Sequence, residues 1–152
     1  MRARAAILLV LLVAAVLAGC GGGDSKRSDY VGALNTAQNG LAQRFTQLQA
    51  KITATSSAAQ DRATLKAYEG AVSTTVRDLR AIEPPEGFGA LHQRFVGEVA
   101  DYGDALRKAR AELGGDDPQD ILAAQGRLRT AVQQTGVKLN ATIKAINDKL
   151  QG

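Results

Sequence analysis

Residues 65–99 read LKAYEGAVSTTVRDLRAIEPPEGFGALHQRFVGEV, and they carry two helical repeats separated by a pair of prolines. On each side of Pro84-Pro85, apolar residues recur three or four positions apart, which is the spacing of one face of a helix. Proline lacks the amide N–H that a helix needs, and it disfavours helix at the preceding residue, so the first helix stops here. The stretch therefore predicts two helices with a short connection, which makes them antiparallel neighbours.

Helical repeats of the same kind fill the chain on both sides of this stretch. We predict helices over 28–52, 58–82, 86–113 and 118–150. The predicted core stripes are, in chain order, Val31, Leu34, Leu41, Phe45, Leu48, Ile52; Leu65, Tyr68, Val72, Val76, Leu79, Ile82; Leu91, Phe95, Val99, Tyr102, Leu106, Ala109, Leu113; and Leu122, Leu128, Val132, Leu139, Ile143, Ile146, Leu150. No segment alternates as a strand does. The prediction is all-α: an up-down-up-down four-helix bundle over 29–152, after a cleaved signal peptide and a flexible tether.

Capping residues mark the starts of three of these helices. Ser28 is placed to cap the first, since a serine side chain can accept a hydrogen bond from a free amide there. Ser57 and Gln60 form the capping-box pattern at the start of the second. Asp117 followed by Pro118 suits the start of the fourth.

Glycines at positions 40, 70, 97, 103, 126 and 136 fall in the interiors of the predicted helices. Each glycine costs about 1 kcal/mol against alanine in a helix interior. We expect close approach between helices to compensate for this cost, and a kinked or splayed bundle is the alternative.

The composition fits one globular domain of helices. The chain has 152 residues, 45% of them hydrophobic and 22% charged, with few aromatics and no tryptophan. Of the 19 basic residues, Arg2 and Arg4 lie in a segment that we expect to be removed, which leaves 17 against 15 acidic residues. The basic residues are spread along the chain without a basic stripe, so we expect no nucleic-acid partner. The single cysteine cannot form an internal disulfide.

The first 20 residues, MRARAAILLVLLVAAVLAGC, have the form of a secretory signal peptide. A positive end is followed by the apolar run Ala5 to Val16, which is shorter than the roughly 20 residues that span a membrane. The last four residues, Leu17-Ala18-Gly19-Cys20, resemble the lipobox of bacterial lipoproteins. An uncleaved membrane helix, or an ordinary signal peptide with an incidental cysteine, is the weaker interpretation.

The lipobox resemblance implies a specific modification of Cys20. A diacylglyceryl group is attached to its sulfur, and the signal peptide, residues 1–19, is cut off before it. Two acyl chains anchor a protein stably, whereas one chain gives only marginal binding. Residues 20–28 would then be a glycine-rich tether. The expected location is the outer face of the bacterial cell membrane, or the outer membrane in a cell that has two.

Beyond the tether, the chain resembles the small, functionally uncharacterised helical lipoproteins of bacteria with Ala-, Gly- and Arg-rich proteomes, notably actinobacteria. This resemblance is one of overall pattern. It implies no site residue other than Cys20.

The sequence offers few residues for catalysis or for cofactor binding. Its only histidine is His92 and its only methionine is Met1, so the ligand sets of di-iron, zinc and haem sites are missing. We therefore expect no metal, no cofactor and no enzyme activity. His92 is interpreted as a polar residue on the flank of the bundle. The alternative, a catalytic base, would require a cleft and a carboxylate within hydrogen-bond reach.

Aromatic residues offer the one candidate pocket. Tyr68 and Tyr102 fall on core stripes, and they could line a space between helices together with Phe45, Phe95 and His92. More often such tyrosines are core residues whose hydroxyls reach the surface. Phe88 is expected to be buried, and contact with the lipid surface is its alternative.

Three functions follow from these expectations. The first is a membrane-anchored interaction or scaffold module of the cell envelope, which binds lipid through diacylglyceryl-Cys20 and docks on another envelope protein. The second is a helical bundle that holds a small apolar ligand between its helices. The third and weakest is an enzyme.

Overall fold

The computed structural model describes residues 25–49, 57–112 and 118–151, and it is all-α over these ranges. It contains α1 (Ser25–Gln49), α2 (Ala58–Arg80), α3 (Gly89–Glu112) and α4 (Pro118–Gln151). The prediction of a four-helix, all-α fold is confirmed. The predicted signal peptide, the lipobox and most of the tether lie outside the described residues.

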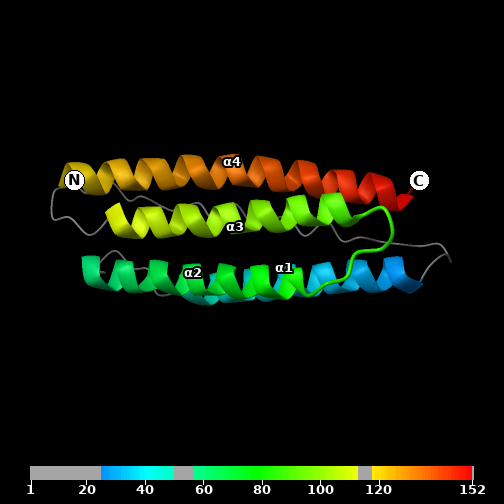
Figure 1. Ribbon diagram of the computed structural model, residues 1–152. Coiled ribbons are helices and arrows are strands. Elements are labelled where there is room, and N and C mark those ends of the chain that lie inside the picture. The colour runs from blue at the N-terminus through cyan, green and yellow to red at the C-terminus, as the bar shows by residue number, and fades with distance from the viewer. Residues whose placement is uncertain (1–24, 50–56, 113–117, 152) are drawn as a thin grey trace.

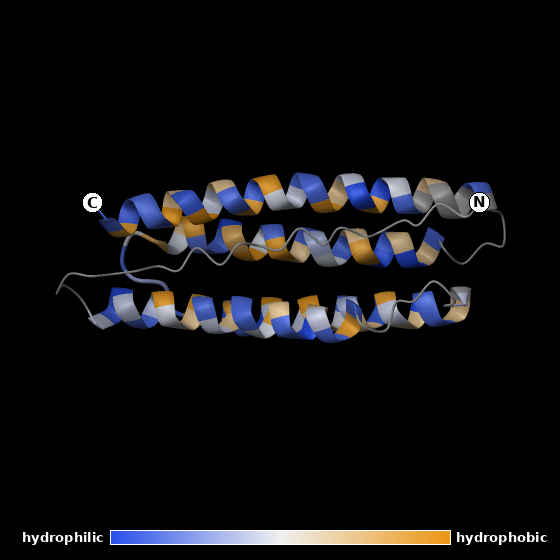
Figure 2. Cartoon of the chain, turned by 180° about the vertical axis from the view of Figure 1, so that it is seen from behind, coloured by the Kyte–Doolittle hydropathy of each residue, from blue (hydrophilic) through white to orange (hydrophobic). Residues whose placement is uncertain are grey.

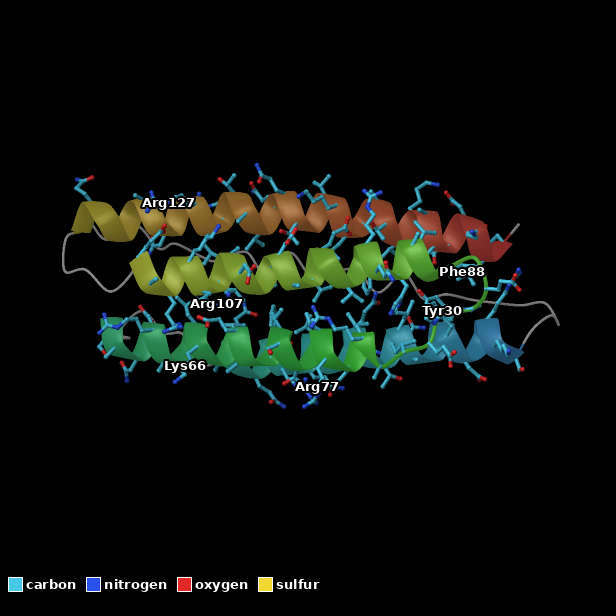
Figure 3. All side chains as sticks on the ribbon, viewed as in Figure 1. Tyr30, Lys66, Arg77, Phe88, Arg107 and Arg127 are labelled. Carbon is cyan, nitrogen blue, oxygen red and sulfur yellow. The ribbon has the colours of Figure 1, made fainter. Side chains whose placement is uncertain are left out.

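The four helices run alternately up and down (Figure 1). The start of α1, the connection from α2 to α3 and the end of α4 therefore share one end of the molecule. Tyr30 and Phe88 lie next to each other there (Figure 3), so we call it the Tyr30 end.

The helices form two antiparallel pairs, and α2 and α3 are the two inner helices. α3 packs closely against both α2 and α4, and α2 packs closely against both α1 and α3. Within the described ranges, α1 and α4 are not a closely packed pair. Hydrophilic and hydrophobic residues alternate along each helix (Figure 2), as expected for helices that bury part of their surface and expose the rest.

The buried core follows the predicted stripes, with one shift on α1. In α2, the predicted apolar residues from Leu65 to Leu79 are all buried. In α1, Tyr30 is buried whereas the predicted Val31 is partly exposed. The reason is that α1 turns its first turns toward α3, where Tyr30 contacts Phe88 and His92.

The predicted helix starts differ from the observed ones in two places. α1 begins at Ser25, so Ser28 lies inside the helix and the prediction that it caps the start is wrong. Lys26 and Arg27 are good helix formers, which lets the helix extend back into the segment predicted to be tether. α3 begins only at Gly89 because Gly87 has a φ of +79°, a left-handed conformation that interrupts helix. The capping box of Ser57 and Gln60 is confirmed.

The explanation predicted for the helical glycines holds at one position. A Cβ on Gly103 would lie 3.2 Å from Cγ1 of Val72, so this glycine permits α2 and α3 to approach closely. At the other five positions, a Cβ would have no neighbouring atom within 4 Å. The prediction of close approach is wrong for those five, listed as Gly40, Gly70, Gly97, Gly126 and Gly136.

Candidate functional site

The residues predicted to share a pocket lie at different levels of the bundle. His92 lies at the Tyr30 end, in contact with Tyr30. Phe45, Tyr68 and Tyr102 contact one another in a separate group, which we call the aromatic cluster. Phe95 is buried in the core, and among the described residues its ring does not contact the rings of that cluster.

His92 is buried inside the bundle rather than exposed on its flank, with only 5% of its surface accessible. Its Nε2 lies 3.0 Å from the carbonyl oxygen of Leu79, and its Nδ1 lies 3.2 Å from the Tyr30 hydroxyl. The flank prediction is wrong because Tyr30 of α1 and the last turn of α2 both contact His92 and cover it.

The partners of His92 fix its tautomer. The Leu79 carbonyl can only accept, so Nε2 of the ring carries the hydrogen and donates it. In the neutral ring Nδ1 is then an acceptor, and the Tyr30 hydroxyl donates to it. The ring thereby joins α3 to α1 and to the last turn of α2, where helix carbonyls lack partners within the helix.

Burial sets the ionisation of this group. It lowers the pKa of His92, and the hydrogen bond to the Leu79 carbonyl opposes this effect. Burial also raises the pKa of Tyr30 to about 12. At neutral pH the pair is therefore a neutral imidazole and a protonated phenol.

Phe88 and Lys149 lie at the Tyr30 end, near this histidine. Phe88 is 1% exposed, which confirms the prediction of burial over the alternative of lipid contact. The Lys149 ammonium lies 5.4 Å from the centre of the Phe88 ring, and it donates a hydrogen bond of 2.7 Å to the Gly87 carbonyl. The end of α4 is thereby joined to the connection between α2 and α3.

The aromatic cluster is packed by its own members. The rings of Phe45 and Tyr68 meet edge-on with centres 4.8 Å apart, and those of Phe45 and Tyr102 lie 5.9 Å apart. The Tyr68 hydroxyl donates to the Phe45 carbonyl at 3.4 Å. Burial raises the pKa of Tyr102, and nearby Tyr68 raises it further. These three rings are therefore in mutual contact, as in a packed core.

A buried carboxylate at the α3–α4 contact was missed by the sequence analysis. Glu98 is 6% exposed, and its Oε1 accepts from Arg94 and from the buried Thr142 of α4, each at 3.0 Å. Its Oε2 is also buried and has no hydrogen-bond partner within the part of the chain that the structure describes. The signal was present in the sequence, because Glu98 stands at core spacing between Phe95 and Tyr102.

A surface groove of about 330 Å³ lies between α3 and α4. Small and charged residues line it, among them Asp101, Ala105 and Lys108 from α3, and Arg127, Ala131 and Lys138 from α4. Arg127 bridges to Glu112 of α3 at 3.0 Å. Lys108 and Lys138 have no ion-pair partner among the described residues, so the groove offers two cations to a bound molecule.

Three further features are absent from the described part of the chain, and the predicted lipidation site lies outside it. Within residues 25–49, 57–112 and 118–151, no group of three metal-ligating side chains occurs, and no helix is long and apolar enough to cross a membrane. Over the same ranges, no carboxylate hydrogen-bonds His92. The predicted lipidation site, Cys20, is not among the described residues.

Comparison with known proteins finds no relative: no protein-family model, no curated protein and no solved structure matches this chain.

Proposed function

We propose that the chain is an exported lipoprotein that is anchored in the outer face of the membrane through diacylglyceryl-Cys20 and acts without catalysis, by docking on another envelope protein. The sequence LAGC at residues 17–20, which contains the only cysteine of the chain, carries the proposal. Small residues directly before the cysteine suit cleavage by a signal peptidase, and a thiol is the natural nucleophile for forming a thioether.

The topology of the bundle supports a role away from the lipid. α1 begins at Ser25, shortly after Cys20, so the Tyr30 end is the end nearest the anchor. A helix of 25 residues is about 38 Å long at 1.5 Å per residue. An upright bundle would present the opposite end, with Arg127 and the α3–α4 groove, well clear of the headgroups (Figure 3).

The side-chain packing favours docking over ligand storage. The members of the aromatic cluster contact one another, and Phe95 is buried in the core. The α3–α4 groove, by contrast, is open and charged, and Lys108 and Lys138 have no ion-pair partner among the described residues. Surface recognition of a partner by charge is the use that this arrangement suits.

The anchor is tested by replacing the cysteine. We expect the wild-type chain to fractionate with membranes and to carry a diacylglyceryl group on its N-terminal peptide by mass spectrometry. A Cys20→Ser variant lacks the thiol and should lose both the lipid and the cleavage. Equal membrane association and equal processing of the two chains would contradict the proposal.

Docking is tested by photo-crosslinking in native cells from two matched positions. A photoreactive residue replaces Lys138 in the groove or, as control, Lys66 on the exposed side of α2 (Figure 3). We expect one recurrent protein adduct from position 138 and none from position 66. Recovery of the unlinked chain alone from both positions would contradict docking through the groove and would redirect the search to small ligands.

A further inference from the structure

We propose that the hydrogen-bonded chain Tyr30–His92–Leu79 is a pH-sensitive latch, which holds the first turns of α1 against the bundle at neutral pH and releases them when His92 is protonated. The latch is a property of the described helices. It requires neither the lipid anchor nor a protein partner, so it stands or falls separately from the proposed function.

The latch joins three helices through one ring. Tyr30 of α1 donates to Nδ1 of His92 on α3, and Nε2 of His92 donates to the Leu79 carbonyl at the end of α2. The ring also meets the Tyr30 ring edge-on, with centres 5.7 Å apart. His92 is the only histidine of the chain, so no other imidazole titrates between pH 5 and 8.

Protonation changes the hydrogen bond that holds Tyr30. The imidazolium has hydrogens on both nitrogens and accepts nothing, so the Tyr30 hydroxyl loses its acceptor. The hydroxyl can turn to accept from Nδ1–H, but its own hydrogen then faces a buried site with no second acceptor among its described contacts. The charge itself is buried, which is unfavourable unless water reaches it.

The charged groups around His92 do not supply a counter-charge. Among the described residues, Tyr30 is the one ionisable side chain that hydrogen-bonds it, and burial raises the pKa of that phenol to about 12. From α4 the Lys149 ammonium approaches Phe88, and it is positive itself. Arg80 at the end of α2 and Glu83 and Glu86 in the connection are exposed to solvent. Burial accordingly lowers the pKa of His92.

The start of α1 is the element best placed to move. Residues 25–29 are exposed, and the next buried residue after Tyr30 is Leu34. α1 is not closely packed against α4 within the described ranges. The other side of the ring is held more firmly, because Leu79 and His92 belong to helices that pack closely along their length. Water reaches His92 at least cost when Tyr30 leaves.

Hydrogen exchange measured by mass spectrometry tests the latch on the full-length chain. Exchange of residues 25–34 is compared between pH 7.5 and pH 5, with labelling times scaled for the intrinsic effect of pH. We expect opening of this segment to increase several-fold, with a ceiling of about 30-fold that the ordinary histidine pKa of 6.5 sets. Exchange in α2 and α3 should change less than twofold.

His92→Gln is the matched variant, because a glutamine amide both donates and accepts and does not titrate. We expect its exchange at residues 25–34 to change less than twofold over the same range of pH. Tyr30→Phe should open the segment already at pH 7.5. An equal rise in wild type and His92→Gln, no rise in wild type, or a rise confined to residues 81–91 would overturn the proposal.

A second measurement covers the case in which His92→Gln does not fold. Because the chain has one histidine, its ring signal can be titrated by NMR in the wild type without assignment. The titration midpoint of the ring must coincide with the pH midpoint of opening at residues 25–34. Midpoints that differ by more than about half a pH unit would overturn the latch.

Discussion

At the scale of single residues, the burial of His92 is explained by hydrogen bonds at both of its ring nitrogens. One ring nitrogen donates to the last turn of α2, and the other accepts from α1. A buried polar group with all of its partners present specifies one arrangement of its neighbours, and it is costly when any partner is missing. The burial of Tyr30 follows from the same contact.

Replacing Tyr30 by phenylalanine should therefore destabilise the protein. Tyr30→Phe keeps the ring but leaves Nδ1 of buried His92 without a donor, which costs about 1–3 kcal/mol. The control is Tyr102→Phe, whose hydroxyl has no hydrogen bond to any described residue and whose loss should matter by less than about 0.5 kcal/mol. Urea unfolding followed by circular dichroism measures both. A loss of stability in Tyr30→Phe as small as that in Tyr102→Phe would show that the Tyr30 hydroxyl contributes nothing.

How far the site was predictable depends on what decides burial at each residue. The burial of Tyr68 and Phe95 followed from helical spacing alone, because each lies on a continuous apolar stripe. The burial of Tyr30 and His92 did not, since each stands one position from a predicted core residue, Val31 or Leu91. Helical spacing predicts which face of a helix is buried, but not how wide the buried face is. That width depends on how many helices pack around the helix.

At the scale of elements, the contact between α3 and α4 contains polar residues at core positions. Glu98 on α3 faces Thr142 on α4, and Thr135, seven residues before Thr142, is also buried. A buried carboxylate is costly unless it is paired and hydrogen-bonded. Oε1 of Glu98 has both Arg94 and Thr142 as partners, whereas Oε2 has no hydrogen-bond partner among the described residues. This pair of helices is therefore held by a specific hydrogen bond in addition to apolar packing.

Removing the Thr142 hydroxyl tests that hydrogen bond. Thr142→Val keeps the shape of the side chain but takes a donor from buried Glu98, at a cost of about 1.5–3 kcal/mol for a bond to a charged group. Thr135→Val is the matched control, because the Thr135 hydroxyl has no hydrogen-bond partner among the described residues, so it should leave stability unchanged or raise it slightly. Thermal and urea unfolding decide between them. Unchanged stability of Thr142→Val would mean that the hydrogen bond from Arg94 is sufficient for Glu98 and that the one from Thr142 adds nothing.

The helical glycines separate helix propensity from helix packing. Gly70→Ala introduces a Cβ with no neighbour within 4 Å, so it should raise the free energy of unfolding by about 1 kcal/mol. Gly103→Ala gains the same propensity, but its Cβ would press on Val72, which is buried, and overpacking costs about 1–3 kcal/mol. We expect the Gly103 variant to be about 1 kcal/mol less stable than wild type. Equal stabilisation of the two variants in urea unfolding would refute the close approach of α2 and α3.

Helix starts illustrate which local signals were sufficient. The capping box of Ser57 and Gln60 places the start of α2 correctly, because both of its hydrogen bonds are local in sequence. Ser28 offered a cap as well, yet α1 continues back to Ser25 through Lys26 and Arg27, which favour helix. A capping residue is compatible with a helix start at its position. It does not fix the start there when the residues before it also favour helix.

At the scale of the whole molecule, the Tyr30 end combines three features in one place. It holds the start of α1, the connection between α2 and α3, and the end of α4, and it buries the one histidine of the chain. Lys149 joins α4 to Gly87 there, and Tyr30 joins α1 to α3. Conditions that affect this end therefore act on all four helices.

The stability of the whole domain should depend on pH through this histidine. Burial lowers the pKa of His92 in the folded state, so as pH falls the unfolded chain takes up the proton first, near its ordinary value of 6.5. The free energy of unfolding is then highest above pH 7, decreases as pH falls through 6.5, and levels off below the lowered folded pKa. One proton limits the slope to about 1.4 kcal/mol per pH unit.

Urea unfolding between pH 7.5 and pH 5 measures this dependence, with His92→Gln as the control that should be nearly flat. Comparison with hydrogen exchange then distinguishes two ways of accommodating the proton. If α1 opens locally, exchange at residues 25–34 rises as pH falls, before the loss of global stability is complete. The reason is that the open state hydrates His92 without unfolding the other helices. If the global free energy falls and this segment does not open, His92 stays neutral in the closed bundle and takes up its proton only on global unfolding. A wild-type curve as flat as that of His92→Gln would show that burial does not disfavour the protonated ring.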